Sequence, residues 1–400
     1  MGGRVPRYTS YPTANRFTPA VGPSTVRSWL GALDPDLPLS LYVHVPFCKK
    51  LCLYCGCNTQ IVSRHRPIGA FVADLIAEIG AAAAALPARM HVRHVHFGGG
   101  TPTALAPREF TAIMRRLRHC FEIAPDAEIA IEIDPRTLTG DMVAALADAG
   151  VTRASLGVQD FDPDVQRAVG RVQPFAMTAD TVADLRGAGI AQVSFDLIYG
   201  LPRQTVATVE RTVDLASSLH PDRVALFGYA HVPWMKPQQK ALERFGLPDI
   251  EQRWAMARAA EARLTEHGYV HVGMDHFARP ADRLALAAAR GGLHRNFQGY
   301  TTDDCPVLLG FGPSAISALP QGYAQSHADT DQWRAAVGRG ELPVARGIAL
   351  DGDDRLRRAA IERLMCDMRV DLGAICRSFG VDPEAEFADE FDQGTQGNAE

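Results

Sequence analysis

Short apolar runs alternate with longer segments of helical periodicity through the first two thirds of the chain. Six runs of six or seven residues are rich in β-branched and apolar side chains, namely 39–45, 92–97, 128–134, 153–159, 192–198 and 223–229. Five intervening segments repeat apolar residues at helical spacing and are bounded by Pro, Gly, Asp or Thr, namely 67–86, 107–120, 138–149, 178–188 and 205–219. This alternation predicts βα units around a parallel sheet, and six units favour an open or partial barrel.

The βα rhythm stops after a further predicted helix at 249–267. Residues 273–317 are rich in Gly, His, Asn and aromatic residues, and we expect them to cap the barrel mouth. Helices are expected near 353–368 and 371–379, followed by an acidic tail at 382–400 that we expect to be frayed. The predicted α/β fold therefore has an N-terminal extension (1–38), a partial (β/α)6 TIM-like barrel (39–272) and a smaller, mainly helical C-terminal region (273–400).

Composition and charge narrow the class of protein. The 400 residues are 46% hydrophobic and 22% charged, as in soluble globular proteins. We expect a cytoplasmic protein, because the N-terminus has no apolar signal region and no apolar stretch is long enough to span a bilayer. The net charge of -5 argues against a general nucleic-acid surface. Basic residues are almost all arginine, with lysine only at 49, 50, 236 and 240, a bias that codon preference explains most simply.

Four cysteines stand within ten residues: Cys48, Cys52, Cys55 and Cys57. The spacing of the first three suits a 4Fe–4S cluster that keeps one iron open, because a cluster normally takes four protein ligands. S-adenosylmethionine can bind the open iron, and an electron from the cluster can then cleave its carbon–sulfur bond to give a carbon radical. A closed zinc site is the alternative, but such sites usually pair two Cys-x2-Cys knuckles. The other cysteines are scattered, which favours the cluster.

Glycines and polar side chains follow the predicted strands. The run from Gly98 to Pro102 directly follows the second strand, where glycine backbone can approach a ligand closely, although a tight turn would look the same. Glu132, Gln159 and Asp196 end the third, fourth and fifth strands. Chemistry in parallel α/β folds gathers at this edge, and helix capping alone does not explain three such residues. Arg171 can meet a carboxylate there, with a surface ion pair as the alternative.

With these motifs the sequence resembles a known family, the oxygen-independent coproporphyrinogen III oxidases of the radical S-adenosylmethionine superfamily. The likeness runs from the Pro-Arg-Tyr-Thr-Ser-Tyr-Pro-Thr motif at 6–13 to about residue 317. The longest shared motifs are Tyr-Val-His-Val-Pro-Phe-Cys at 42–48, Gly-Gly-Gly-Thr-Pro-Thr at 98–103, Gly-Val-Gln-Asp-Phe at 157–161, Gly-Met-Asp-His-Phe-Ala at 273–278 and Leu-His-Arg-Asn-Phe-Gln-Gly-Tyr at 293–300.

The resemblance implies one 4Fe–4S cluster and two S-adenosylmethionine molecules. The implied cluster ligands are Cys48, Cys52 and Cys55. Positions matching the neighbourhood of the cluster-bound S-adenosylmethionine are Tyr42, Gly99, Glu132, Ala230 and Ile316. Those matching the second molecule are Tyr54, Gly100, Thr101, Gln159, Arg171 and Asp196. Cys57 matches a cysteine of the oxidase signature that does not bind the cluster, and it is a candidate for a catalytic role.

The implied reaction is the oxidative decarboxylation of two propionate side chains of coproporphyrinogen III to vinyl groups, giving protoporphyrinogen IX for haem biosynthesis. It needs an electron donor for the cluster and a terminal electron acceptor that the sequence does not identify. A monomer is expected. The main alternative is a haem-binding chaperone of the same superfamily, although those relatives typically carry an aromatic residue at the position of Cys57. A structural zinc protein is a third hypothesis. Compared with the family pattern, the C-terminal region is expected to be shortened.

Overall fold

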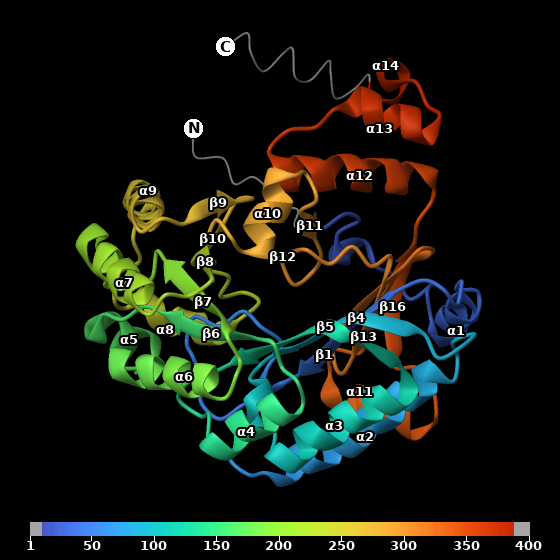
Figure 1. Ribbon diagram of the computed structural model, residues 1–400, viewed down its shortest axis with the longest axis horizontal. Coiled ribbons are helices and arrows are strands. Elements are labelled where there is room, and N and C mark those ends of the chain that lie inside the picture. Colours follow the sequence, from blue (N-terminus) through green and yellow to red (C-terminus); the bar gives the residue numbers. More distant parts are fainter. Residues whose placement is uncertain (1–9, 388–400) are drawn as a thin grey trace.

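A single sheet of 12 strands forms the centre of the computed structural model, which describes residues 10–387 (Figure 1). Its middle consists of six mutually parallel strands, in the order β1 (Leu39–Val45), β4 (His91–Gly99), β5 (Glu122–Ile133), β6 (Arg153–Gln159), β7 (Gln192–Tyr199) and β8 (Arg223–Gly228). β1 is flanked by β13 and β4, and β8 by β7 and β10, so the sheet does not close. The expected α/β fold with a partial barrel is confirmed.

Helices cover the outer face of these strands. They are α2 (Arg66–Ala83), α3 (Pro107–Cys120), α4 (Gly140–Asp148), α5 (Pro163–Val169), α6 (Phe175–Gly187), α7 (Val206–Ser218) and α9 (Ile250–Glu266). Local chemistry explains where they begin. In α9, for example, Asp249 accepts a hydrogen bond from the Gln252 N–H (2.8 Å), while the Gln252 side chain accepts one from the Asp249 N–H (3.0 Å). This reciprocal capping satisfies two backbone donors that a helix start would leave unpaired.

Side chains alternate between the two faces of each strand. In β5, Ile129, Ile131 and Ile133 pack in the apolar core beneath the helices, whereas Glu128 and Glu132 line cavities on the inner face. Every strand of the barrel follows this pattern because successive side chains of a strand point to opposite faces. The inner face is therefore unusually polar, with side chains of Ser40, Tyr42, His94, His96, Arg153, Ser155, Ser194, Asp196 and Arg223.

Further strands extend the sheet at both edges. β13 (Val307–Phe311) pairs parallel with β1, and β14 (Ile316–Leu319), β15 (Gly322–Ser326) and β16 (Val344–Ala349) continue it antiparallel. β10 (His276–Ala278) and β9 (Val270–Val272) complete the other edge. These strands were not predicted from the sequence, because they are short and interrupted by Gly, Ser and Ala. The domain boundary expected at 272/273 stays a prediction.

The C-terminal helices lie across the sheet from α2, α3 and α4, with α12 (Gly352–Asp367) and α13 (Leu372–Phe379) drawn in red in Figure 1. The other elements are α1 (Pro23–Gly31), α8 (Lys240–Glu243), α10 (Arg283–Ala289), α11 (Thr330–Gly338), α14 (Pro383–Glu386), β2 (Phe47–Cys48), β3 (Gln60–Ile61), β11 (His294–Arg295), β12 (Tyr300–Thr301) and the 3-10 helices η1 (Ala14–Arg16), η2 (Pro102–Ala104) and η3 (Pro237–Gln239). Most of the expected acidic tail, residues 388–400, lies outside the described residues, as do residues 1–9, which include the start of the motif at 6–13. Within 10–387, no helix has the length and apolar character needed to cross a bilayer.

A buried carboxyl group fastens α2 to the end of β13. Glu78 of α2 is 3% exposed and accepts a hydrogen bond from the Gly312 N–H (2.8 Å). Gly312 has φ 92°, and a Cβ there would lie 2.4 Å from the His44 carbonyl oxygen, so the chain passes close to β1 at this point. Burial raises the pKa of Glu78 to about 8, so the carboxyl group is largely protonated at neutral pH.

Glu78 should therefore make the fold less stable as the pH rises. Its folded-state pKa is above the unfolded value, so the folded protein binds the extra proton below about pH 8, and stability falls from the unfolded pKa upward through that value. Glu78→Gln should remove this slope. We expect the stability of the variant relative to the parent to grow between pH 5 and 8 by at most about 1.4 kcal/mol per pH unit, measured by anaerobic denaturant unfolding. Glu251→Gln, at an exposed position of α9, is the matched control. Parallel pH profiles for parent and Glu78→Gln would contradict the assignment.

Candidate active site

The loop that follows β1 carries the clustered cysteines. Its two ends are joined by parallel pairing of β2 with β3, where the Val62 N–H donates to the Cys48 carbonyl oxygen (3.0 Å). Cys48, Cys52 and Cys55 are free thiols that line one cavity of ≈ 160 Å³. Three thiols offered from one closed loop into one cavity fit the ligand set of a 4Fe–4S cluster with an open iron.

The glycine run after β4 packs directly on this loop. The Gly100 N–H donates to the Val45 carbonyl oxygen (2.8 Å) and the Thr101 N–H to that of Phe47 (2.8 Å). A Cβ at Gly100 would lie 2.8 Å from the Phe47 oxygen, and one at Gly99, where φ is 116°, would lie 2.7 Å from the His44 ring. Only glycine, which has no Cβ, allows the backbone to approach this closely at both positions. Gly99, Gly100 and Thr101 therefore line the cavity beside the cysteines, and their contact with a ligand stays a prediction.

Glu132 stands at the end of β5 in the same wall. Its carboxylate accepts hydrogen bonds from the Gly99 N–H (3.1 Å) and faces His96 Nε2 (3.3 Å), whose ring stacks on Tyr42. Enclosure by the protein would by itself raise the pKa of Glu132, but the hydrogen bonds from His96 and Gly99 outweigh it and lower the pKa. Glu132 is therefore ionised at neutral pH.

A second carboxyl group in the wall has the opposite character. Asp196 of β7 lies 3.5 Å from the Ser155 hydroxyl. Burial, reinforced by the negative charge of Glu132, raises the pKa of Asp196 to about 7. Two carboxyl groups thus face the same cavity, one ionised and the other close to half protonated at neutral pH. Pairs whose environments separate their pKa values in this way are typical of sites that handle charge and protons.

Arg171 belongs to a buried charge cluster around Cys52. Its guanidinium donates to the Gly157 carbonyl oxygen (2.5 Å), to Asp134 (3.3 Å) and to Cys52 Sγ (3.5 Å). Arg136 also binds Asp134 (2.7 Å) and lies 3.2 Å from Cys52 Sγ. Arg171 was expected to meet a carboxylate, and within residues 10–387 that carboxylate is Asp134. The Nε of Arg171 is buried and has no hydrogen-bond partner within residues 10–387.

Gln159 has an unusual backbone conformation. Its φ is 69°, and the register between β6 and β7 shifts between Gly157 and Gln159. A positive φ costs a non-glycine residue about 1–3 kcal/mol and is found most often at functional sites. Gln159 lines the cysteine cavity together with Tyr54, whose pKa burial raises well above its ordinary value.

The remaining predicted residues lie in different surroundings. Ala230 is exposed and Ile316 packs beside Phe17 and Tyr323, and neither lines the cysteine cavity within the described part of the chain, so their roles stay predictions. Sequence reasoning missed Asp134, Arg136, His96 and Ser155. Polar residues at every second position of the strands were the available signal for His96 and Ser155, since such alternation marks one face of a sheet.

A larger cavity of ≈ 420 Å³ adjoins the first. Four residues line both cavities and form a shared wall: Cys57, Glu132, Ser155 and Asp196. The larger cavity extends along the inner face of the sheet to Arg153, which pairs with Glu128 (3.2 Å), and to Arg223, which pairs with Asp282 (2.8 Å). Its volume is typical of small-molecule sites. Cys57 thus stands between the cysteine cavity and a chamber large enough for a second ligand.

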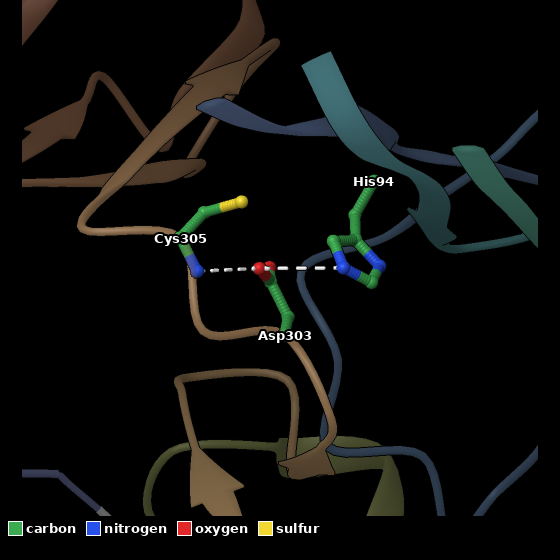
Figure 2. Close-up of side chains that lie close together, drawn as sticks. All are labelled: His94, Asp303 and Cys305. Carbon is green, nitrogen blue, oxygen red and sulfur yellow. Dashed lines mark hydrogen bonds and ion pairs between the residues drawn. The ribbon is translucent and has the colours of Figure 1, made fainter. Parts of the chain in front are cut away.

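The chain from β12 to β13 lines part of the larger cavity and is held in place by contacts among His94, Asp303 and Cys305 (Figure 2). Asp303 accepts hydrogen bonds from the Cys305 N–H (2.9 Å) and the Ser40 hydroxyl, and lies 3.6 Å from His94 Nε2. Burial and the nearby negative charge of Asp303 raise the pKa of Cys305 to about 12, so its thiol is protonated in the protein without a metal. Ser40 belongs to β1 and His94 to β4, so the contacts of Asp303 with these two residues hold the segment between β12 and β13 against the sheet.

Comparisons with known proteins agree with this geometry. Residues 42–216 match the family model of the radical SAM superfamily. The oxygen-independent coproporphyrinogen III oxidase of Bradyrhizobium diazoefficiens is 52% identical over 96% of this chain and 85% of its own length. The chain belongs to the oxygen-independent coproporphyrinogen III oxidase family. The family member of Escherichia coli is 42% identical over 96% of this chain and 83% of its own length.

The solved structure of coproporphyrinogen III oxidase from Escherichia coli, described as a radical SAM enzyme, superposes with a TM-score of 0.92 at 40% identity, over 96% of this chain and 88% of that one. Membership of this family confirms the resemblance noted in the sequence. It also implies a 4Fe–4S cluster and S-adenosylmethionine as cofactors, which the three thiols and the adjoining cavity fit. The number of S-adenosylmethionine molecules and the residues that hold them stay predictions.

Proposed function

We propose that this chain converts two propionate side chains of coproporphyrinogen III to vinyl groups by oxygen-independent oxidative decarboxylation, giving protoporphyrinogen IX. The observation that carries the proposal is the wall shared by the cysteine cavity and the larger cavity. The first suits the cofactors and the second suits a substrate, so the reacting groups can meet at Cys57, Glu132 and Asp196. A cytoplasmic, monomeric enzyme is part of the proposal.

Cys48, Cys52 and Cys55 hold the cluster in this proposal. Their thiols line one cavity, and the guanidinium groups of Arg136 and Arg171 lie within 3.2 and 3.5 Å of Cys52 Sγ. Cys57 is assigned to the substrate side, because it also lines the larger cavity. When bound, the cluster and S-adenosylmethionine together supply a carbon-centred radical able to remove a hydrogen atom from a C–H bond.

The residues of the wall bind and orient the cofactor and substrate. Glu132, held ionised by His96 and Gly99, suits the cationic amino group of S-adenosylmethionine, with Tyr42 beside it. Ala230 and Ile316 complete this proposed set only by resemblance. A second S-adenosylmethionine is assigned to the part of the cysteine cavity around Arg171, whose buried Nε–H lacks a protein acceptor within residues 10–387. The proposed set for it is Tyr54, Gly100, Thr101, Gln159, Arg171 and Asp196.

The substrate step conserves atoms and electrons. A hydrogen atom would pass from the β-carbon of a propionate to the carbon-centred radical that the bound cofactors supply. The bond to the carboxylate carbon would then break, carbon dioxide would depart and one electron would pass to a terminal acceptor. Cys57 stands in the wall where the propionate would approach, and it is our candidate for a catalytic role.

The four cysteines should separate into two classes. Cys48→Ser, Cys52→Ser and Cys55→Ser should each lose the cluster, because an iron left without its thiolate ligand is released. Cys57→Ser should keep it. Iron content after anaerobic reconstitution measures this, with about four irons per chain expected for the parent and Cys57→Ser. Loss of iron from Cys57→Ser, or retention in Cys55→Ser, would contradict the assignment.

The number of S-adenosylmethionine molecules can be counted directly. Anaerobic equilibrium dialysis of the reconstituted protein should show about two bound molecules per chain. Arg171→Lys should weaken the second about tenfold and leave the first, because lysine keeps the charge but lacks the planar fork of donors. Unchanged iron content serves as the control for this variant. A parent protein that holds a single molecule at saturation would overturn the two-molecule proposal.

The function itself is tested by an anaerobic assay with coproporphyrinogen III, S-adenosylmethionine and dithionite, in which vinyl product and 5'-deoxyadenosine are measured together. Both should accumulate, and Cys48→Ser should form neither. Deoxyadenosine without vinyl product would contradict the decarboxylase. Tight binding of haem with no turnover and an intact cluster would instead support the chaperone alternative.

A further inference from the structure

The lysines of the chain gather at one place. Of its 41 basic residues only four are lysine. Lys49 and Lys50 lie inside the cysteine loop, and Lys236 and Lys240 lie in the segment that follows β8. Codon preference explains why arginine dominates elsewhere, but it does not explain why the exceptions share one location. The distribution points to a surface that needs the ammonium group in particular.

The two segments are in direct contact. Lys236 Nζ donates to the Cys57 carbonyl oxygen (2.7 Å), the Gln238 side chain to that of Cys55 (2.9 Å) and the Gln239 side chain to that of Tyr54 (2.8 Å). Lys240 follows Gln239 directly. The lysines of both segments therefore lie in or beside the loop whose thiols are assigned to the cluster.

This region is positive on a chain that is negative overall. Residues 48–66 contain no acidic residue, and they add the exposed Arg64 and Arg66 to the two lysines. Residues 230–243 contain one, Glu243, which is paired with His231 (3.0 Å). Within residues 10–387 none of the four lysines forms an ion pair; Lys50 also lines the cysteine cavity, and Lys49 and Lys240 are exposed. The whole chain carries a net charge of -5.

Large apolar side chains are exposed among these charges. Trp234 is 67% exposed and Met235 is 68% exposed, two residues and one residue before Lys236. Leu51 of the cysteine loop and Ile61 of β3 are 44% and 48% exposed. Exposed apolar residues rimmed by charge are typical of protein interaction sites. Tryptophan and methionine are also enriched at interfaces, where lysine in general is not.

We propose that Lys49, Lys50, Trp234, Met235, Lys236 and Lys240, here called the lysine surface, dock a small acidic electron-transfer protein of low potential. The proposal rests on the proposed function, which requires one electron from outside for each cleavage of S-adenosylmethionine. One electron leaves the donor protein and enters the cluster, and no bond forms or breaks in this transfer. The lysine surface borders the cysteine loop itself, so a donor docked there is next to the cluster ligands.

Lysine suits a partner that must leave after each electron. Its ammonium group is compact, flexible and strongly hydrated, whereas arginine favours fixed bidentate pairs with carboxylates. Complexes for electron transfer are small and weak among protein interfaces. Opposite charges then supply fast encounter and orientation more than lasting affinity. An acidic partner and a rim of lysines around Trp234 and Met235 match these requirements.

The test compares two double charge reversals in the reconstituted holoenzyme. Lys49→Glu/Lys240→Glu changes two exposed lysines, and Arg27→Glu/Arg115→Glu changes two exposed arginines on α1 and α3 by the same total charge. The probes are an acidic plant-type 2Fe–2S ferredoxin and an acidic flavodoxin. Anaerobic calorimetry at low salt should show that the lysine variant binds the active probe at least about tenfold more weakly than the parent, with the arginine variant within about twofold.

Cluster reduction provides the second readout. The probe that binds, once reduced, should bleach the cluster absorbance about tenfold more slowly in the lysine variant, and Trp234→Ser should slow it as well. Dithionite, which needs no docking, should reduce the parent and all variants at equal rates. Binding and reduction are measured without the porphyrin substrate. Their results can therefore be interpreted even if the decarboxylase assay fails. The proposal is overturned if neither probe binds the parent, or if both double variants lose affinity equally.

Discussion

The polar inner face of the sheet is the constraint on which the rest of the structure depends. Each barrel strand places apolar side chains beneath the outer helices and polar ones inside, where they line cavities instead of a packed core. A polar group enclosed in this way needs a partner, because leaving it unsatisfied costs about 1–3 kcal/mol. Arg153 pairs with Glu128, Asp303 binds Ser40 and Asp196 faces Ser155. The fold thus holds charged groups in fixed positions around an enclosed space.

Close contact between the loop after β1 and the loop after β4 forms the part of this enclosed space that is proposed to hold the cofactors. The loops after β1 and β4 emerge from neighbouring parallel strands, and backbone hydrogen bonds from Gly100 and Thr101 join them. Because glycine has no Cβ, the backbone can lie against the cysteine loop and still present the Gly99 N–H to Glu132. The same contact therefore fixes the position of the thiols and the orientation of the carboxylate that faces them.

Much of this arrangement could be predicted from the sequence, and the failures have physical reasons. β1, β6 and α3 have the predicted bounds because their apolar patterns end at clear turn or capping residues. β14 and β15 were missed because Gly, Ser and Ala carry little strand signal, and their stability comes from pairing with a sheet already formed. Asp134 and Arg136 were missed because their importance lies in meeting Arg171 and Cys52, residues distant along the chain. Ala230 and Ile316 were suggested by family resemblance alone.

The cysteine loop has different surroundings on its two sides. In the proposed arrangement this separates the entry of electrons from the binding of substrate. Cys57 lines both cavities, while its carbonyl oxygen accepts a hydrogen bond from Lys236. A loop that carries the cluster ligands must be near the surface to receive electrons and near the substrate to use them. If the substrate entered by the lysine surface, its carboxylates would compete with the electron donor for the same ammonium groups. In the proposed arrangement the chamber on the inner face of the sheet avoids that competition, because strand residues would bind the substrate and loop residues would bind the donor.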